Sequence, residues 1–188
     1  MLGIDASLSS TGYAYQSDAG LVTGRVTTGD LRGPYRLVYI RNQLASVLQK
    51  AAPTLVVLED YAMGARGNNM FHIGELGGIL KALIWERSID LLLLSPTMLK
   101  LAITGKGNAD RGKAGKGKPE MRKALNDRFG YDIPQNDEAD AAGLMIIGEA
   151  LRGVRQIDNH VGKSNHFKVI SQIQVIKGKL QLISKTHS

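Results

Sequence analysis

The sequence contains no cysteine and no long hydrophobic run, and both absences exclude classes of protein. Without cysteine there is no disulfide scaffold, no zinc site built on thiolates and no cysteine nucleophile. No apolar stretch approaches about 18 residues, so no segment is expected to span a membrane. The first residues lack a basic stretch followed by an apolar run, so no signal peptide is expected. These features predict a cytoplasmic protein that makes no contact with a membrane.

Length and charge define the broad class of the chain. Its 188 residues, 43% of them hydrophobic, predict a globular protein with one main domain. The net charge of +7 favours a polyanionic partner, although many basic proteins bind none. The charge is unevenly distributed: residues 1–99 are neutral, 100–128 carry +6, 129–151 carry −5 and 152–188 carry +6. An acidic block between two basic blocks indicates that each has a local role.

The apolar pattern predicts an α/β fold. Three short β-rich runs open the chain and form an antiparallel meander, and the fully apolar run 55–58 is typical of a buried central strand. Strands are expected over residues 2–7, 11–16, 21–28, 55–58 and 91–94, and helices over 33–51, 70–83, 96–104, 120–129 and 137–151. This order predicts a mixed five-stranded sheet flanked by helices, with the meander at one edge.

Three further features of the chain lead to structural expectations. Trp85 is expected to pack in the interior and His72 to lie at the surface. The basic extension over residues 154–188 has two interpretations. Its Val- and Ile-rich part predicts a hairpin around residues 177–179, while its even mixture of Gln, Ser and Lys favours a loosely attached extension.

The positions of the carboxylates point to function. Asp5 interrupts an apolar strand and Glu59 directly follows another, so the two converge if these strands are neighbours. Asp137 and Asp140 are three residues apart and share one face of a helix. Taken singly, such residues are usually turn formers or partners of a helix dipole. Together they favour a site for divalent cations, because clustered carboxylates are costly unless cations compensate their charge.

The same residues resemble a known family. The segments 3–7 (GIDAS) and 11–13 (TGY) resemble the opening strand-turn-strand of RuvC-type Holliday-junction resolvases. Residues 57–59 (VLE) are similar to the second acidic motif of that family, and residues 137–140 (DEAD) to its third and fourth acidic positions. Residues 95–107 resemble the family segment that ends in TG-x-G. The matches follow the family order through about residue 152.

The resemblance implies an RNase H-like fold over residues 1–153 and a homodimer that nicks branched DNA with divalent metal. By resemblance, Asp5, Glu59, Asp137 and Asp140 are the catalytic metal ligands, for two Mg²⁺ or Mn²⁺ ions per site. The resemblance also implies a dimer interface on the helix over residues 70–83. Ala62 replaces the aromatic residue that the family carries three residues after its second acid. We therefore expect the neighbouring Tyr61 to stack on a base.

The glycine- and lysine-rich segment 105–118 is expected to be an exposed loop that grips phosphates, because glycine allows close backbone approach and lysine neutralises phosphate charge. Residues 107–113 fit the start of a nucleotide-binding P-loop, but Ala114 stands where that motif needs Ser or Thr, so no nucleotide cofactor is expected. Lys106 and Lys118 match basic positions of the family. The full set of DNA contacts expected in the loop is Lys106, Lys118, Arg111, Lys113 and Lys116.

Three functions compete at this point. The first is a metal-dependent endonuclease that resolves four-way and other branched DNA by paired nicks, leaving 5′-phosphate and 3′-hydroxyl ends. The second is a non-catalytic protein that binds branched DNA, which would lose acids from the metal site. The third is an actin-like or sugar-kinase-like ATPase, because the opening segment also resembles a phosphate loop. Such ATPases need two domains around the nucleotide, and all four acids are present, so the endonuclease is favoured.

Overall fold

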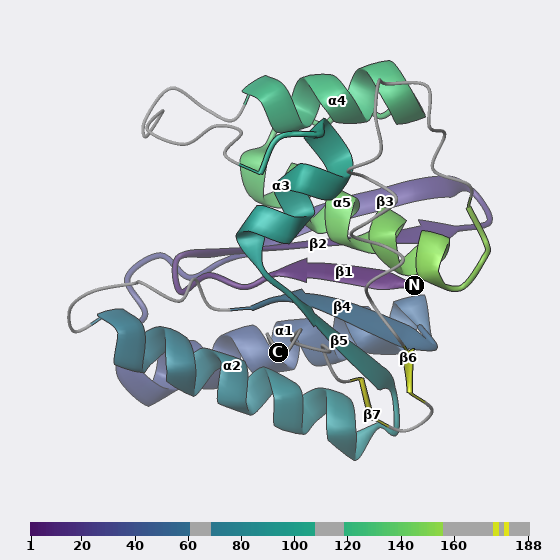
Figure 1. Ribbon diagram of the computed structural model, residues 1–188. Helices are drawn as coiled ribbons and strands as arrows, with labels where there is room; N and C mark the ends of the chain where they lie inside the picture. Colours follow the sequence, from purple (N-terminus) through teal and green to yellow (C-terminus); the bar gives the residue numbers. More distant parts are fainter. Residues whose placement is uncertain (61–68, 108–118, 156–174, 177–178, 181–188) are drawn as a thin grey trace, which may run out of the picture.

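The computed structural model describes residues 1–60, 69–107, 119–155, 175–176 and 179–180 (Figure 1). The predicted elements are all present. The strands are β1 (Leu2–Asp5), β2 (Ser10–Ser17), β3 (Gly20–Thr27), β4 (Leu55–Glu59), β5 (Asp90–Leu94), β6 (Val175–Ile176) and β7 (Lys179–Leu180). The helices are α1 (Gly33–Ala51), α2 (Asn69–Glu86), α3 (Pro96–Thr104), α4 (Pro119–Phe129) and α5 (Asn136–Leu151). Among these described residues, no helix combines the length and apolar character needed to cross a membrane.

The central sheet has the strand order β3-β2-β1-β4-β5. The first three strands form the predicted antiparallel meander, in which Asp5 is opposite Gly12 and Gly12 is opposite Arg25. β4 runs parallel to both β1 and β5, with Ile4 beside Leu58 and Glu59 beside Leu94. The expectation that the first strand and the 55–58 strand are neighbours is therefore confirmed, as is the mixed α/β sheet.

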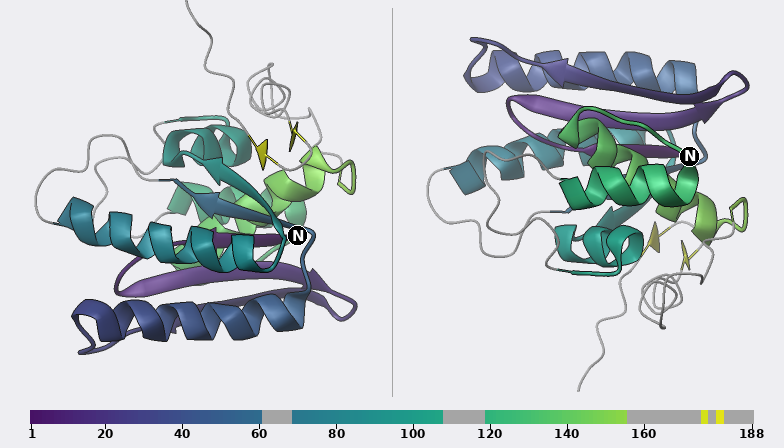
Figure 2. Two further views of the ribbon diagram at one scale, coloured as in Figure 1. Left: turned by 90° about the horizontal axis from the view of Figure 1, so that it is seen from below. Right: turned by 90° about the horizontal axis from the view of Figure 1, so that it is seen from above.

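Helices cover both faces of the sheet, α1 and α2 on one side and α3, α4 and α5 on the other (Figures 1 and 2). Each layer has its own hydrophobic core. Residues 55–58 of β4 are all apolar because both faces of the strand are buried. Val56 and Leu58 face the core under α1 and α2, while Leu55 and Val57 face the other core. The N-terminus of α3 has the predicted cap, with the Ser95 hydroxyl accepting a hydrogen bond from the Met98 backbone N–H at 3.3 Å.

α5 lies against the sheet by direct backbone contact. A Cβ atom added to Gly3 would stand 2.0 Å from the carbonyl oxygen of Ala141, and one added to Gly12 would stand 2.1 Å from that of Asp137. Only glycine leaves room for this approach, which is one reason for an isolated glycine within a strand. The helix is buried on nearly all sides between residues 139 and 149, more than its predicted packing face implied, because α3 and α4 cover its outer side.

Two other expectations have different outcomes. The prediction that Trp85 packs in the interior is wrong: its side chain is 74% exposed at the end of α2, whereas Leu83 and Ile84 beside it are buried. The predicted hairpin is confirmed for the described part of the extension, where β6 pairs with β7 in antiparallel register and β7 lies beside β5 (Figure 1). The domain boundary at residue 153 stays a prediction.

Candidate active site

Three carboxylates from three separate elements meet at one edge of the sheet. Asp5 ends β1, Glu59 ends β4 and Asp140 lies in the second turn of α5. One carboxylate oxygen from each residue lies within 4.8 Å of those of the other two. The convergence of Asp5 and Glu59 follows from the parallel pairing of β1 with β4, since neighbouring parallel strands end at the same edge. The Gly3 and Gly12 contacts bring Asp140 down to them.

The chemistry of this group suits a divalent cation. Three carboxylates so close together repel one another, and the Asp140 side chain is only 2% exposed, so water screens its charge poorly. A bound cation removes this penalty, and carboxylate oxygens are the ligands that Mg²⁺ and Mn²⁺ prefer. The three side chains come from two strands and a helix, which hold them more firmly than loops would.

Asp137, the fourth predicted ligand, is not part of this close group. It lies one turn before Asp140 on the same helix and is partly buried. Its backbone rests on Gly12, whose register partner on β1 is Asp5. Asp137 therefore flanks the three carboxylates on the side of β2.

Lys106 lies just beyond the end of α3, where Gly105 adopts a left-handed conformation with φ of 79°. The Thr104 hydroxyl shapes this turn by donating to the carbonyl of Lys100 at 2.8 Å and accepting from the Lys106 N–H at 3.1 Å. The Lys106 side chain is 68% exposed, and its ammonium group is 3.8 Å from a carboxylate oxygen of Glu120. α3 starts directly after β5, and the chain folds back along the helix beyond Lys106, since a Cβ atom added to Gly107 would stand 3.1 Å from the methyl group of Thr97 in the first turn of α3.

A groove between α3 and α4 continues from Lys106. Its lining combines both signs of charge: Ile103, Thr104, Lys106, Glu120, Lys123, Ala124, Asp127 and Arg128. Arg128 donates to the carbonyls of Ala102 and Ile103 and so ties α4 to the end of α3. The other predicted DNA contacts, Tyr61, Arg111, Lys113, Lys116 and Lys118, lie outside the described residues. His72 lies at the surface as expected, 3.0 Å from Glu75.

A contact network beside the carboxylates is not predicted by any pattern in the sequence. Glu138 accepts a hydrogen bond from the Thr23 hydroxyl at 2.6 Å and lies 3.6 Å from the guanidinium of Arg25. Thr23 and Glu138 are 115 positions apart in sequence, and no local pattern links them. The close contacts of Gly3 and Gly12 with α5 do have a sequence signal, because an isolated glycine in a strand indicates close approach of another backbone.

The protein has a mixed five-stranded sheet with helices on both faces, and its carboxylates gather where the parallel strands β1 and β4 end. These two features define the RNase H-like class of phosphodiester-cleaving enzymes. Comparison with known proteins narrows this class. The family model described as crossover junction endodeoxyribonuclease RuvC matches residues 1–117. The chain belongs to this family, and the enzyme class expected from the sequence is confirmed.

Relatives and solved structures agree with this assignment. A RuvC endonuclease from Caldicellulosiruptor saccharolyticus is 27% identical over 155 residues, covering 78% of this chain and 89% of the relative. One from Rickettsia felis is 26% identical over 158 residues, covering 81% and 98%. Among solved structures, Thermus thermophilus RuvC matches with a TM-score of 0.62 at 19% identity, covering 82% of this chain and 98% of that one. The same protein in complex with a Holliday junction substrate gives 0.64 at 19% identity, covering 81% and 95%. These two structures confirm the RNase H-like fold.

Proposed function

We propose that this protein is a metal-dependent endonuclease that resolves four-way and other branched DNA by paired nicks. The observation that carries the proposal is the meeting of Asp5, Glu59 and Asp140 within 4.8 Å. A protein that only binds branched DNA has no use for three carboxylates held together at such electrostatic cost. Holliday junction DNA is the substrate in the solved complex of Thermus thermophilus RuvC, which supports the same substrate here.

Asp5, Glu59 and Asp140 would hold the cations, and Asp137 would join them from the same face of α5. We propose two Mg²⁺ or Mn²⁺ ions per site. When bound, such ions activate a water molecule and stabilise the attacking and leaving oxygens of a phosphodiester. The carboxylates keep a fixed geometry because β1, β4 and α5 pack through buried backbone contacts. Attack of water on phosphorus and rupture of its bond to the 3′-oxygen leave a 3′-hydroxyl and a 5′-phosphate.

The DNA backbone would extend from the carboxylates along α3 to Lys106. Lys118, Arg111, Lys113 and Lys116 are proposed as further phosphate contacts and Tyr61 as a base contact. The cytoplasmic location expected from the sequence stays part of this proposal.

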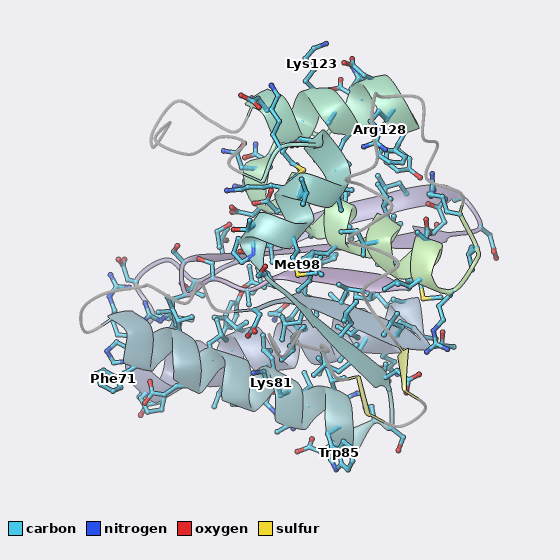
Figure 3. All side chains as sticks on the ribbon, in the orientation of Figure 1. Phe71, Lys81, Trp85, Met98, Lys123 and Arg128 are labelled. Atoms are coloured by element: carbon cyan, nitrogen blue, oxygen red, sulfur yellow. The ribbon has the colours of Figure 1, made fainter. Side chains whose placement is uncertain are left out.

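A homodimer would place two active sites on two strands of one junction, since the two-fold symmetry of a dimer matches that of a four-way junction. Apolar side chains on the outer face of α2 support this assembly. Phe71 and Trp85 are 71% and 74% exposed and project from the two ends of the helix (Figure 3).

The proposal is tested by incubating the full chain with Mg²⁺ or Mn²⁺ and end-labelled four-way, three-way, flap and linear DNA. Symmetric nicks in the four-way junction that DNA ligase can seal are expected, because ligation needs a 5′-phosphate and a 3′-hydroxyl. Tight junction binding without nicks would favour the non-catalytic binding protein. ATP hydrolysis without DNA cleavage would favour the ATPase.

A further inference from the structure

The first turn of α5 lies over β2. It rests on Gly12, where a Cβ atom would stand 2.1 Å from the carbonyl oxygen of Asp137. Gly12 lies between Asp5 on β1 and Arg25 on β3 in the sheet register. Asp140 and Glu138 are two residues apart and so project about 200° from each other around the helix. Asp140 reaches the carboxylates of β1 and β4, while Glu138 reaches β3 on the opposite side.

Both carboxylate oxygens of Glu138 are engaged by β3. The Thr23 hydroxyl donates to Oε2 at 2.6 Å, and Nε of Arg25 lies 3.6 Å from Oε1. Thr23 and Arg25 are two residues apart on one strand, so their side chains share the face that α5 covers. The Glu138 side chain is 15% exposed, which shields these contacts from solvent more than those of an ordinary surface ion pair.

These contacts oppose a force that acts on the same turn. Asp140 is held close to Asp5 and Glu59, and without a cation their negative charges push the start of α5 away from the sheet. The contacts of Glu138 with β3 pull the start of α5 back towards the sheet. We propose that Glu138 is a positioning residue: it holds α5 against β3 and so places Asp140 and Asp137 for cation binding. This proposal rests on the proposed metal dependence.

The other end of α5 offers a matched control. There Arg152 pairs with Asp90 at the start of β5, and the two side chains are 32% and 37% exposed. This pair also joins α5 to the sheet, but Arg152 lies 12 residues from Asp140, or about 18 Å along the helix. Breaking it should loosen the helix without displacing the carboxylates.

The experiment measures Mn²⁺ binding to the full chain without DNA, by titration calorimetry. Thr23→Val is the decisive variant because it removes the hydroxyl donor without changing charge or shape, so weaker binding cannot come from the removal of a negative charge. Thr23→Val and Glu138→Ala should weaken Mn²⁺ binding by about tenfold or more, the usual effect of removing a residue that orients metal ligands. Thr23→Ser should restore binding, and Asp90→Asn should lower the melting temperature with unchanged Mn²⁺ affinity.

Two results would overturn the proposed positioning role of Glu138. One is wild-type Mn²⁺ affinity in Thr23→Val, whatever the affinity of Glu138→Ala; the other is an equal loss of affinity in Asp90→Asn, which would mean that any loosening of α5 has the same effect. If Glu138→Ala does not fold, the isosteric Thr23→Val still decides the question. A wild-type chain that neither binds Mn²⁺ nor cleaves DNA would instead contradict the proposed function, so the two failures are distinguishable.

Discussion

The carbonyl oxygen of Asp137 on α5 rests directly on Gly12 of β2, at a place where any side chain larger than hydrogen would collide with it. Gly12 is opposite Asp5 in the sheet, so this contact sets the height of the acidic helix above the first catalytic candidate. The geometry of the carboxylates thus depends on a glycine that has no chemistry of its own.

Gly12→Ala should therefore impair the candidate metal site, although it adds only one methyl group. The new methyl group would stand 2.1 Å from the Asp137 oxygen, so the start of α5 must move away from the sheet. We expect a destabilisation of about 1–3 kcal/mol, typical of overpacking, together with weaker Mn²⁺ binding. Chemical denaturation and calorimetry measure the two effects. Gln16→Ala is the control: this exposed side chain of the same strand accepts from the Tyr131 hydroxyl at 3.5 Å, the outer limit of a hydrogen bond, so its removal should change neither.

Asp5→Asn should abolish cleavage while leaving junction binding largely intact. The substitution keeps the size of the side chain but removes one charged cation ligand from the group of three. Loss of several kcal/mol of transition-state stabilisation corresponds to a fall in nicking rate of more than about a hundredfold. Junction nicking with Mg²⁺ and fluorescence anisotropy measure the two properties. Asp18→Asn, in the turn at the other end of β2, should cleave normally; retained nicking by Asp5→Asn would remove Asp5 from the metal site.

Replacing Lys106 and Lys118 by Ala should weaken DNA binding and its dependence on salt. Removing one lysine–phosphate interaction reduces the slope of log affinity against log salt concentration by about 0.9 for duplex DNA. Binding measured over a range of salt concentrations gives the slope. Lys123→Ala is the control: this lysine lines the same groove and is 75% exposed, but it pairs with Asp127 at 2.6 Å on the outer side of α4 (Figure 3). An unchanged slope in the double variant would exclude both lysines from the phosphate contacts.

Phe71→Glu and Trp85→Glu should separate the proposed dimer. Burying a charge in an apolar interface is costly, and a penalty of about 2 kcal/mol raises the dissociation constant by about thirtyfold. Light scattering across protein concentration measures the assembly, and the timing of the two nicks reports its effect on cleavage. Tyr35→Glu is the control, since Tyr35 is 81% exposed on α1 rather than α2. A wild-type chain that stays monomeric at high concentration would exclude the dimer.

Tyr13 should make stability sensitive to alkaline pH. Burial, with help from Tyr15 and Glu138, raises the pKa of the Tyr13 phenol above its ordinary 10.0. The folded chain therefore holds this proton more tightly than the unfolded chain does. The stabilisation is fully present below pH 10.0 and is lost as pH rises through the higher pKa of the folded state.

Tyr13→Phe removes that dependence, so the difference in unfolding free energy between wild type and variant should shrink above pH 10.0. Urea denaturation at a series of pH values measures it. Tyr35→Phe, at a tyrosine that is 81% exposed, is the control substitution. A difference curve for Tyr13→Phe that stays flat with pH would show that the Tyr13 phenol titrates alike in both states.

Much of the fold could be predicted because its signals are local. The alternation in β2, the unbroken apolar run of β4 and the Ser95 cap each depend on residues within one element, and the structure contains all three. The prediction for Trp85 is wrong for a related reason: helical spacing identifies a helix, but neighbours distant in sequence decide which face of the helix is covered.

The same distinction between local and long-range signals applies to the candidate site. The acidic residues, their order and the segments that carry them could be predicted, because they follow from composition and motif. Their arrangement depends on tertiary contacts: Asp5, Glu59 and Asp140 meet while Asp137 flanks them, and Glu138 contacts β3 instead. The physical reason is that these contacts join positions far apart in the chain, through strand register and the close approach that Gly3 and Gly12 allow.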